Sequence, residues 1–358
     1  MFLSRVASGF IGVALTSECL RMPSLTTLFT TAIGLPAALW TFKSAMLVAF
    51  QRRIIYMGYS PVGARTEELA RADELKSGMR ITKISAEVAR GVRVDGLEAA
   101  SGAHSPQTPI LFYLQGNAGN PLSRLPLFAR ILGVSSKGSQ ISKSSSSSMR
   151  IIAFAPSSYW TSTRRAPTQP RLLEDYAAAL RRTHQLYPHA PIILYGHSLG
   201  GSIATLLCAG RSGSGDLCSG VHALILENAF ESIPAMVKAY FVSPKVPYYH
   251  LHPLVFDKWD ALGAAKDVQV PTMVLVSGDD ELVPREHGLA LHNALPRSRM
   301  HVIPGALHEN AYSKPSWPRI VTAFVTYSKP HTTNNLARTI HIGNIQYISH
   351  MHPSRRVY

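Results

Sequence analysis

The sequence is poor in cysteine and lacks the short patterns that indicate a bound metal, nucleotide or nucleic acid. Its 358 residues include three cysteines, Cys19, Cys208 and Cys218, which do not make a disulfide framework. We find no zinc-ligand spacing, no RNP-like aromatic motif, no long Lys/Arg run and no Walker lysine pattern. These absences argue against a disulfide-stapled protein, a zinc domain and a P-loop protein, and we expect neither a metal nor a cofactor.

Charged residues are also scarce, at 16 % of the chain, but their balance is strongly basic. The formal net charge is +15 and the pI is near 9.9, which suggests nucleic acid or an anionic membrane surface as a partner. Because the basic residues are scattered rather than grouped, we expect no nucleic-acid partner. Apolar residues make up 46 % of the chain, enough for the core of one large α/β domain or two small ones.

The first 50 residues carry almost no charge, and residues 25–50 are mostly apolar. This stretch meets the length of about 20 apolar residues that a membrane helix needs, and Gln51-Arg52-Arg53 ends it. A membrane anchor, a cleaved signal peptide and a buried amphipathic helix are the competing interpretations. The late start and the lack of a small-residue cleavage site argue against a signal peptide. We therefore expect residues 1–53 to form an N-terminal membrane-anchor segment. Basic residues lie on both sides of the apolar stretch, so its direction across the membrane does not follow from the sequence.

Beyond residue 53, short apolar runs alternate with helical patterns, which predicts an α/β fold with a mostly parallel central sheet flanked by helices. We expect residues 54–328 to form this domain, with residues 230–262 as a small cap or a disordered lip. The Ser-rich insertion at 135–148 is predicted to be a disordered loop and residues 329–358 a poorly ordered tail. Strands are predicted at 79–84, 88–94, 109–114, 149–155, 191–195, 221–227, 272–277 and 300–303, and helices near 125–132, 171–180, 202–209 and 317–327.

The pentapeptide Gly196-His197-Ser198-Leu199-Gly200 is the centre of the functional interpretation. It follows a β-prone apolar run and precedes a stretch compatible with a helix. This is the context of a nucleophile elbow, in which a serine occupies a strained strand-to-helix turn. A plain Gly-rich turn is the alternative. We expect His197, the variable position of the motif, to pack or cap rather than catalyse.

Two later loops supply the partners that a serine nucleophile needs, in the order Ser, Asp, His. Asp279-Asp280 follows the strand ending at Ser277, and His308 follows the strand ending at Ile303. Each loop comes directly after an apolar strand. An earlier loop, Gln115–Asn120, follows the strand at 109–114. It is interpreted as half of an oxyanion hole, with a phosphate-binding loop or a plain turn as alternatives.

Residues from about 50 to 327 resemble the α/β-hydrolase superfamily, and within it the membrane-associated Bem46-like serine hydrolases of the fungal type. The resemblance rests on residues 50–56, 116–120, 277–284 and 304–308, on the elbow, and on the fungal-type run 155–162. It implies an α/β-hydrolase fold with a catalytic triad of Ser198, Asp280 (rather than Asp279) and His308. It also implies an oxyanion hole made by the backbone N–H groups of Asn117 and Leu199. The family usually has His-Gly where this chain has Gln115-Gly116, so we expect altered loop packing there.

The first hypothesis is a single-pass serine hydrolase of an endomembrane, with the endoplasmic reticulum favoured. It would cleave ester or thioester bonds through an acyl-enzyme, using membrane lipid or a lipidated protein such as a palmitoyl-protein as substrate. The second hypothesis is a catalytically silent, membrane-tethered interaction protein in cell polarity.

Overall fold

The computed structural model describes residues 24–69, 79–134, 149–213, 217–241 and 247–328. The chain divides into two compact units, residues 1–47 and 48–358, and each is described by itself. The insertion predicted to be disordered at 135–148 and the tail at 329–358 lie outside the described residues, as do residues 1–23 of the expected anchor.

A helical run extends without a break from Leu25 to Ile55. It consists of α1 (Leu25–Phe29), a π-helical turn η1 (Thr30–Gly34) and α2 (Leu35–Ile55). The run has 31 residues and a mean hydropathy of 1.5 in its apolar window. By length and composition it is a candidate membrane span.

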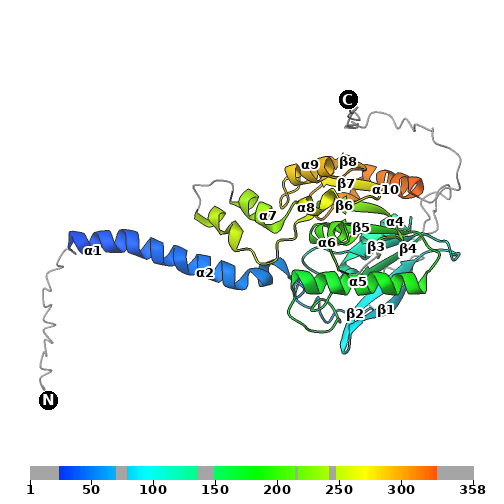
Figure 1. Cartoon of the computed structure of the whole chain (residues 1–358), viewed down its shortest axis with the longest axis horizontal. Helices are drawn as coiled ribbons and strands as arrows, with labels where there is room; N and C mark the ends of the chain where they lie inside the picture. The colour runs from blue at the N-terminus through cyan, green and yellow to red at the C-terminus, as the bar shows by residue number, and fades with distance from the viewer. Residues whose placement is uncertain (1–23, 70–78, 135–148, 214–216, 242–246, 329–358) are drawn as a thin grey trace, which may run out of the picture. The chain divides into compact units, whose positions relative to one another are not determined.

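The second unit is built on one eight-stranded sheet with the order β1-β2-β4-β3-β5-β6-β7-β8 (Figure 1). The pairs β1–β2 and β2–β4 are antiparallel, and the five remaining neighbouring pairs are parallel. The central strands β3 and β5 are completely buried, as expected of apolar runs covered on both faces. The strands are β1 (Arg80–Ala89), β2 (Val92–Ala100), β3 (Ile110–Leu114), β4 (Arg150–Phe154), β5 (Ile192–His197), β6 (Val221–Glu227), β7 (Thr272–Ser277) and β8 (Ser298–Ile303).

The first two strands differ from the sequence prediction in their boundary. One hairpin with its turn at Arg90-Gly91 replaces the expected break after residue 84. Gly91 has φ of +76°, a conformation that glycine adopts without steric cost. This glycine, rather than the polar residues before it, therefore sets the turn.

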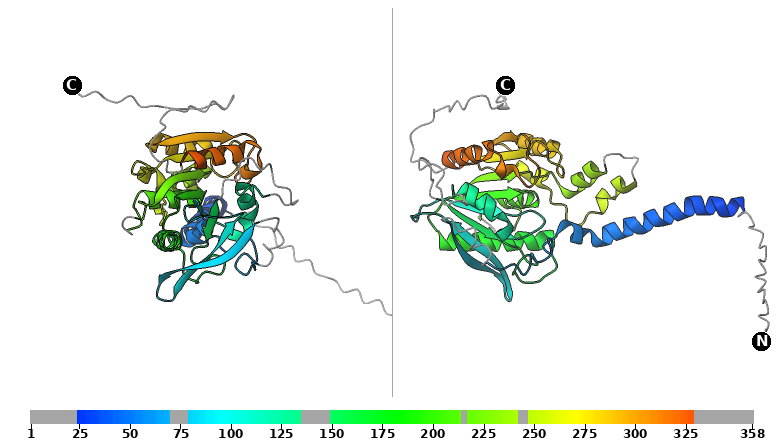
Figure 2. Two further views of the ribbon diagram at one scale, coloured as in Figure 1. Left: turned by 90° about the vertical axis from the view of Figure 1, so that its right-hand side faces the viewer. Right: turned by 180° about the vertical axis from the view of Figure 1, so that it is seen from behind.

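Helices cover both faces of the sheet (Figure 2). Helices α5, α6, α8 and α9 contact one another in succession, and α4 contacts α10. The predicted cap region 230–262 contains α7 and η3. The bounds are η2 (Pro121–Arg124), α4 (Leu125–Ile131), α5 (Gln169–Leu186), α6 (Leu199–Cys208), α7 (Ile233–Tyr240), η3 (Pro247–Leu254), α8 (Ala261–Ala265), α9 (Arg285–Ala294), η4 (Ala311–Ser313) and α10 (Ser316–Tyr327).

The second unit begins inside α2, at Val48, six residues before the start expected from the sequence. Gln51 Nε2 donates to the carbonyl oxygen of Leu254 at 3.1 Å, and Gln51 Oε1 accepts the Phe256 N–H at 2.7 Å. Arg52 Nε lies 2.9 Å from Asp257 Oδ2. These bonds join the last turns of the helix to the segment that follows η3.

Candidate active site

Ser198 lies in the sharp turn between β5 and α6. Its backbone has φ of 53° and ψ of −121°, a combination that side chains rarely adopt and that costs about 1–3 kcal/mol. The Ser198 N–H donates to the carbonyl oxygen of Glu227 at 2.9 Å, which joins the turn to the end of β6. The strained serine that the sequence predicts is therefore present at the carboxyl edge of the sheet.

Two glycines allow this turn to form, because there is no space for a side chain at either position. A Cβ on Gly196 would lie 2.4 Å from the carbonyl oxygen of Gly200, and one on Gly200 would lie 2.1 Å from the carbonyl oxygen of Leu114. The obstructing atoms belong to backbone, so they cannot rotate away. The spacing of the glycines in the pentapeptide thus follows from the close approach of α6 to β3 and β5.

Asp280 and His308 are hydrogen-bonded to each other, with His308 Nδ1 2.8 Å from Asp280 Oδ2. Both side chains are almost completely buried. Since a carboxylate only accepts, Nδ1 carries the proton and Nε2 keeps a lone pair. Ser198 and His308 are not hydrogen-bonded to each other among the described residues, and such bonds are often long before substrate binds. His197, the residue before Ser198, lies with its Nε2 3.0 Å from the His308 carbonyl oxygen. This contact brings Ser198, Asp280 and His308 to one edge of the sheet.

The loop after β3 is held by hydrogen bonds to the Asn117 carbonyl that leave the Asn117 N–H available. The Asn117 carbonyl accepts the Met57 N–H at 2.7 Å and the Tyr159 hydroxyl at 2.9 Å. In the described part of the chain, no acceptor is bonded to the N–H of Asn117 or of Leu199, the first residue of α6. Free N–H groups at such a loop and at a helix N-terminus suit a developing negative charge. At the position of the family's histidine, Gln115 Nε2 donates to the Gly119 carbonyl at 3.4 Å and closes the same loop.

A charged pair that no sequence pattern indicates lies next to this loop. Arg124 and Glu309 form an ion pair across 185 positions of the chain. Burial alone would raise the pKa of Glu309, but the neighbouring His197 and the Arg124 guanidinium lower it to about 2. Both side chains line a recess of about 310 Å³ next to the loop residues Ala118 and Gly119.

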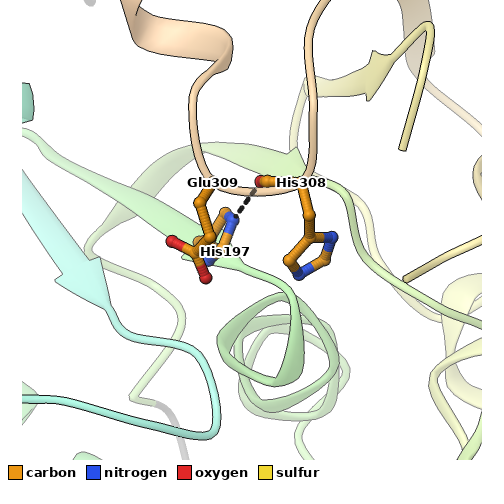
Figure 3. A group of neighbouring side chains, drawn as sticks. All are labelled: His197, His308 and Glu309. Carbon is orange, nitrogen blue, oxygen red and sulfur yellow. Dashed lines mark hydrogen bonds between the residues drawn. The ribbon is translucent and has the colours of Figure 1, made fainter. Parts of the chain in front are cut away.

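His197, His308 and Glu309 form one group in which potential ligand atoms lie within 4.8 Å of one another (Figure 3). His308 Nδ1 is occupied by Asp280, and His197 Nε2 lies 3.0 Å from the carbonyl oxygen of His308. The Arg124 guanidinium already supplies positive charge beside Glu309. A second cation would be repelled here, so we interpret the group as a hydrogen-bonded network rather than a metal centre.

Glu227, the last residue of β6, carries a buried carboxyl group next to the elbow. Glu227 Oε2 accepts the Trp317 indole N–H at 2.8 Å and also the Tyr195 hydroxyl. Burial raises the pKa of Glu227 above its ordinary value. Sequence reasoning missed this residue, together with Asn228 and Ser277, although each is a polar residue at the carboxyl end of a buried strand, which is the one signal that could have identified them.

Comparisons with known proteins agree with this architecture. The chain is 24 % identical over 293 residues to Protein bem46 of Schizosaccharomyces pombe, covering 80 % of this chain and 89 % of that protein. It is 26 % identical over 246 residues to the lysophosphatidylserine lipase ABHD12 of Danio rerio, covering 62 % of this chain, and 30 % identical over 162 residues to that of Rattus norvegicus, covering 39 %. The chain spans 59 % and 39 % of the length of those two lipases. No protein-family model matches it.

Solved structures show the same fold at low sequence identity. An acylaminoacyl peptidase of Pyrococcus horikoshii superposes with a TM-score of 0.53 at 12 % identity, over 75 % of this chain and 45 % of that one. Est1E of Butyrivibrio proteoclasticus gives a TM-score of 0.51 at 14 % identity, over 69 % of this chain and 98 % of that one.

The sheet order, the elbow and these comparisons define an α/β-hydrolase fold. By sequence, the chain is similar to Protein bem46 along most of its length. The fold and the resemblance predicted from the sequence are confirmed.

Proposed function

We propose that this chain is a membrane-anchored hydrolase of acyl esters or thioesters that works through Ser198, His308 and Asp280. The observation that carries the proposal is the Asp280–His308 hydrogen bond of 2.8 Å beside a strained serine. A buried carboxylate that orients an imidazole next to a serine is the arrangement that activates a hydroxyl as nucleophile.

In the proposed reaction, Ser198 Oγ attacks the acyl carbonyl carbon while His308 Nε2 takes the hydroxyl proton. The N–H groups of Asn117 and Leu199 stabilise the oxyanion of the tetrahedral intermediate. Collapse breaks the bond to the leaving group, which receives the proton from His308 and leaves an acyl-enzyme. Water, deprotonated by His308, then releases the acid and regenerates Ser198. Loss of one oxyanion donor typically costs about 10²–10³-fold in rate.

A lipid ester is the substrate class that we favour. Relatives of this chain carry the name lysophosphatidylserine lipase, and the chain contains an apolar helix long enough to span a membrane. A thioester-linked acyl group on a protein is the narrower alternative. We place the enzyme in an endomembrane such as the endoplasmic reticulum, held by the helix Leu25–Ile55.

Labelling with a fluorophosphonate probe tests the proposal in the full chain. We expect the wild type to be labelled and Ser198→Ala to remain unlabelled while keeping its circular dichroism spectrum. An acyl-chain series of lysophospholipids and acyl-cysteine thioesters then ranks the two substrate classes. A folded wild-type protein that neither reacts with the probe nor hydrolyses any of these compounds would contradict the enzyme and favour the tethered interaction protein.

A further inference from the structure

The backbone of His308 is fixed on both sides by side chains from three different segments, which end or follow β5, β6 and β7. Its N–H donates to Glu281 Oε2 at 3.0 Å. Its carbonyl oxygen lies 2.8 Å from Asn228 Nδ2 and 3.0 Å from His197 Nε2. The imidazole that we assign as catalytic base therefore extends from a Cα whose two flanking peptide groups are both held.

Asn228 follows β6 directly and is 3 % exposed. Its φ of 50° is left-handed, a conformation in which asparagine is enriched among residues with a side chain. Its Oδ1 accepts the Ser277 N–H at 2.8 Å, and its Nδ2 lies 2.9 Å from Ser277 Oγ. Ser277 Oγ in turn donates to the Leu307 carbonyl at 2.9 Å. The histidine loop, which follows β8 and contains His308, is thus bonded through two successive carbonyl groups. The Leu307 carbonyl is bonded to Ser277 at the end of β7, and the His308 carbonyl to Asn228 directly after β6.

His197 reaches the same carbonyl from the elbow and is 2 % exposed (Figure 3). Its Nε2 faces a carbonyl oxygen, which only accepts, so Nε2 carries the proton. Burial and the positive charge of Arg124 lower the pKa of His197 to about 4. The ring is therefore a neutral donor near pH 7, and its Nδ1 has no hydrogen-bond partner in the described part of the chain.

We propose that Asn228 and His197 are positioning residues, which together hold the His308 carbonyl and thereby place its imidazole between Ser198 and Asp280. This inference rests on the proposed function of that histidine. Both residues bond the backbone carbonyl of His308, and the His197 ring also packs against the His308 ring, with 5.0 Å between the ring centroids. Their effect is on geometry, and a displacement of about 1 Å in a catalytic group can cost about 10²-fold in rate.

The substitution Asn228→Asp tests whether Asn228 positions His308. Aspartate keeps the shape of the side chain and tolerates a left-handed backbone, but it replaces the donor facing the His308 carbonyl with an acceptor. We expect kcat to fall about 10–100-fold with KM within about twofold of wild type. Proton NMR should also show the Nδ1–H resonance of the Asp280–His308 bond shifted or broadened.

Ser202→Ala is the matched control. Ser202 is a buried residue of α6 whose Oγ donates to the Phe230 carbonyl at 3.3 Å, so its loss removes a similar bond without touching the histidine loop. We expect it to lower Tm while kcat and the Nδ1–H resonance stay as in wild type. If Asn228→Asp behaves like Ser202→Ala, the positioning role is wrong.

Two substitutions of His197 separate the hydrogen bond that its Nε2 donates to the His308 carbonyl from the space that its side chain fills. Glutamine has an N–H donor at a reach close to that of histidine Nε2, whereas leucine fills a similar volume without a donor. We expect His197→Gln to retain most of kcat and His197→Leu to lose about 10-fold or more, with KM little changed in both. Equal kcat values for the two variants would overturn the role of His197. If the wild type itself shows no hydrolysis, the proposed function fails. The Nδ1–H resonance of wild type and the variants still reports whether Asn228 and His197 position His308.

Discussion

Asp280 holds His308 through both carboxylate oxygens, with Oδ2 2.8 Å and Oδ1 3.0 Å from His308 Nδ1. Oδ1 also accepts the backbone N–H groups of Leu282 and Val283 at 2.9 and 2.8 Å. Burial alone would raise the pKa of Asp280, but these hydrogen bonds outweigh it and keep the pKa below its ordinary value. Asp280 is therefore ionised at neutral pH and oriented before any substrate arrives.

Replacing Asp280 by asparagine should lower kcat by about 10³–10⁴-fold, because the amide can turn its NH₂ towards Nδ1 and stabilise the wrong imidazole tautomer. Steady-state hydrolysis of a short-chain p-nitrophenyl ester measures this. Asp279→Asn is the control, since Asp279 is exposed and its backbone N–H, rather than its side chain, bonds to Ala306. Equal losses in the two variants would argue against Asp280 as the triad acid.

Replacing Ser198 by glycine should abolish activity and stabilise the fold. Glycine adopts the observed φ of 53° and ψ of −121° at little cost, so the strain in the elbow is released. We expect the free energy of unfolding in urea to exceed that of Ser198→Ala by about 1 kcal/mol. Alanine loses the hydroxyl but keeps the Cβ strain, which makes it the proper reference. A glycine variant no more stable than alanine would show that the turn stores no strain.

The pKa of about 4 for His197 predicts a stability that depends on pH. Between about pH 6.5 and pH 4 the unfolded chain binds a proton that the buried ring does not, so the free energy of unfolding falls as the pH drops through this window. The contribution of His197, on the order of 3 kcal/mol, is fully present above pH 6.5. Glu309, with a pKa of about 2, adds a further loss as the pH falls from about 4.5 towards 2.

Urea unfolding of wild type and His197→Leu at several pH values between 7.5 and 4.5 isolates the histidine, because other buried histidines titrate in both proteins. We expect the leucine variant to lose less stability over this range. Parallel pH curves for the two proteins would mean that His197 does not contribute in this way.

Alanine at Gly200 should prevent normal folding. Its Cβ would lie 2.1 Å from the Leu114 carbonyl and 2.6 Å from that of Gln115, so backbone must move and the expected cost is about 3 kcal/mol or more. Thermal unfolding and soluble yield measure the effect. Gly102→Asn is the comparison, because Gly102 has φ of +78° but nothing within 4 Å of its Cβ position. Similar damage at both sites would point to general loop sensitivity instead.

Much of this fold follows from local sequence patterns. The strands at 110–114, 192–197 and 272–277 are continuous apolar runs, and the elbow carries its own glycine signature. The order of Ser198, Asp280 and His308 could be predicted because each follows a strand that is recognisable by itself. The β1–β2 boundary was misplaced because residues 88–94 alternate apolar and basic residues as a strand does, so the turn at Gly91 is hidden inside that pattern.

The contacts that support the site could not be predicted from the sequence, for a different reason. Arg124 and Glu309 are 185 positions apart, and Asn228 and His308 are 80 apart. No local pattern links such residues, and each by itself resembles an ordinary surface charge or turn residue. Their pairing depends on the order of strands in the sheet, which brings the loops together only after folding.

The bonds made by Gln51 and Arg52 determine where the N-terminal apolar helix can be removed. A cut after residue 55 would leave the Leu254 carbonyl, the Phe256 N–H and the Asp257 carboxylate without the partners they have in the full chain. Of these groups the Asp257 carboxylate is buried, so the loss of its partner costs about 1–3 kcal/mol. Proteolysis there would yield a destabilised second unit rather than an intact one. A soluble fragment for crystallisation should therefore start at Val48 and keep two turns of the helix.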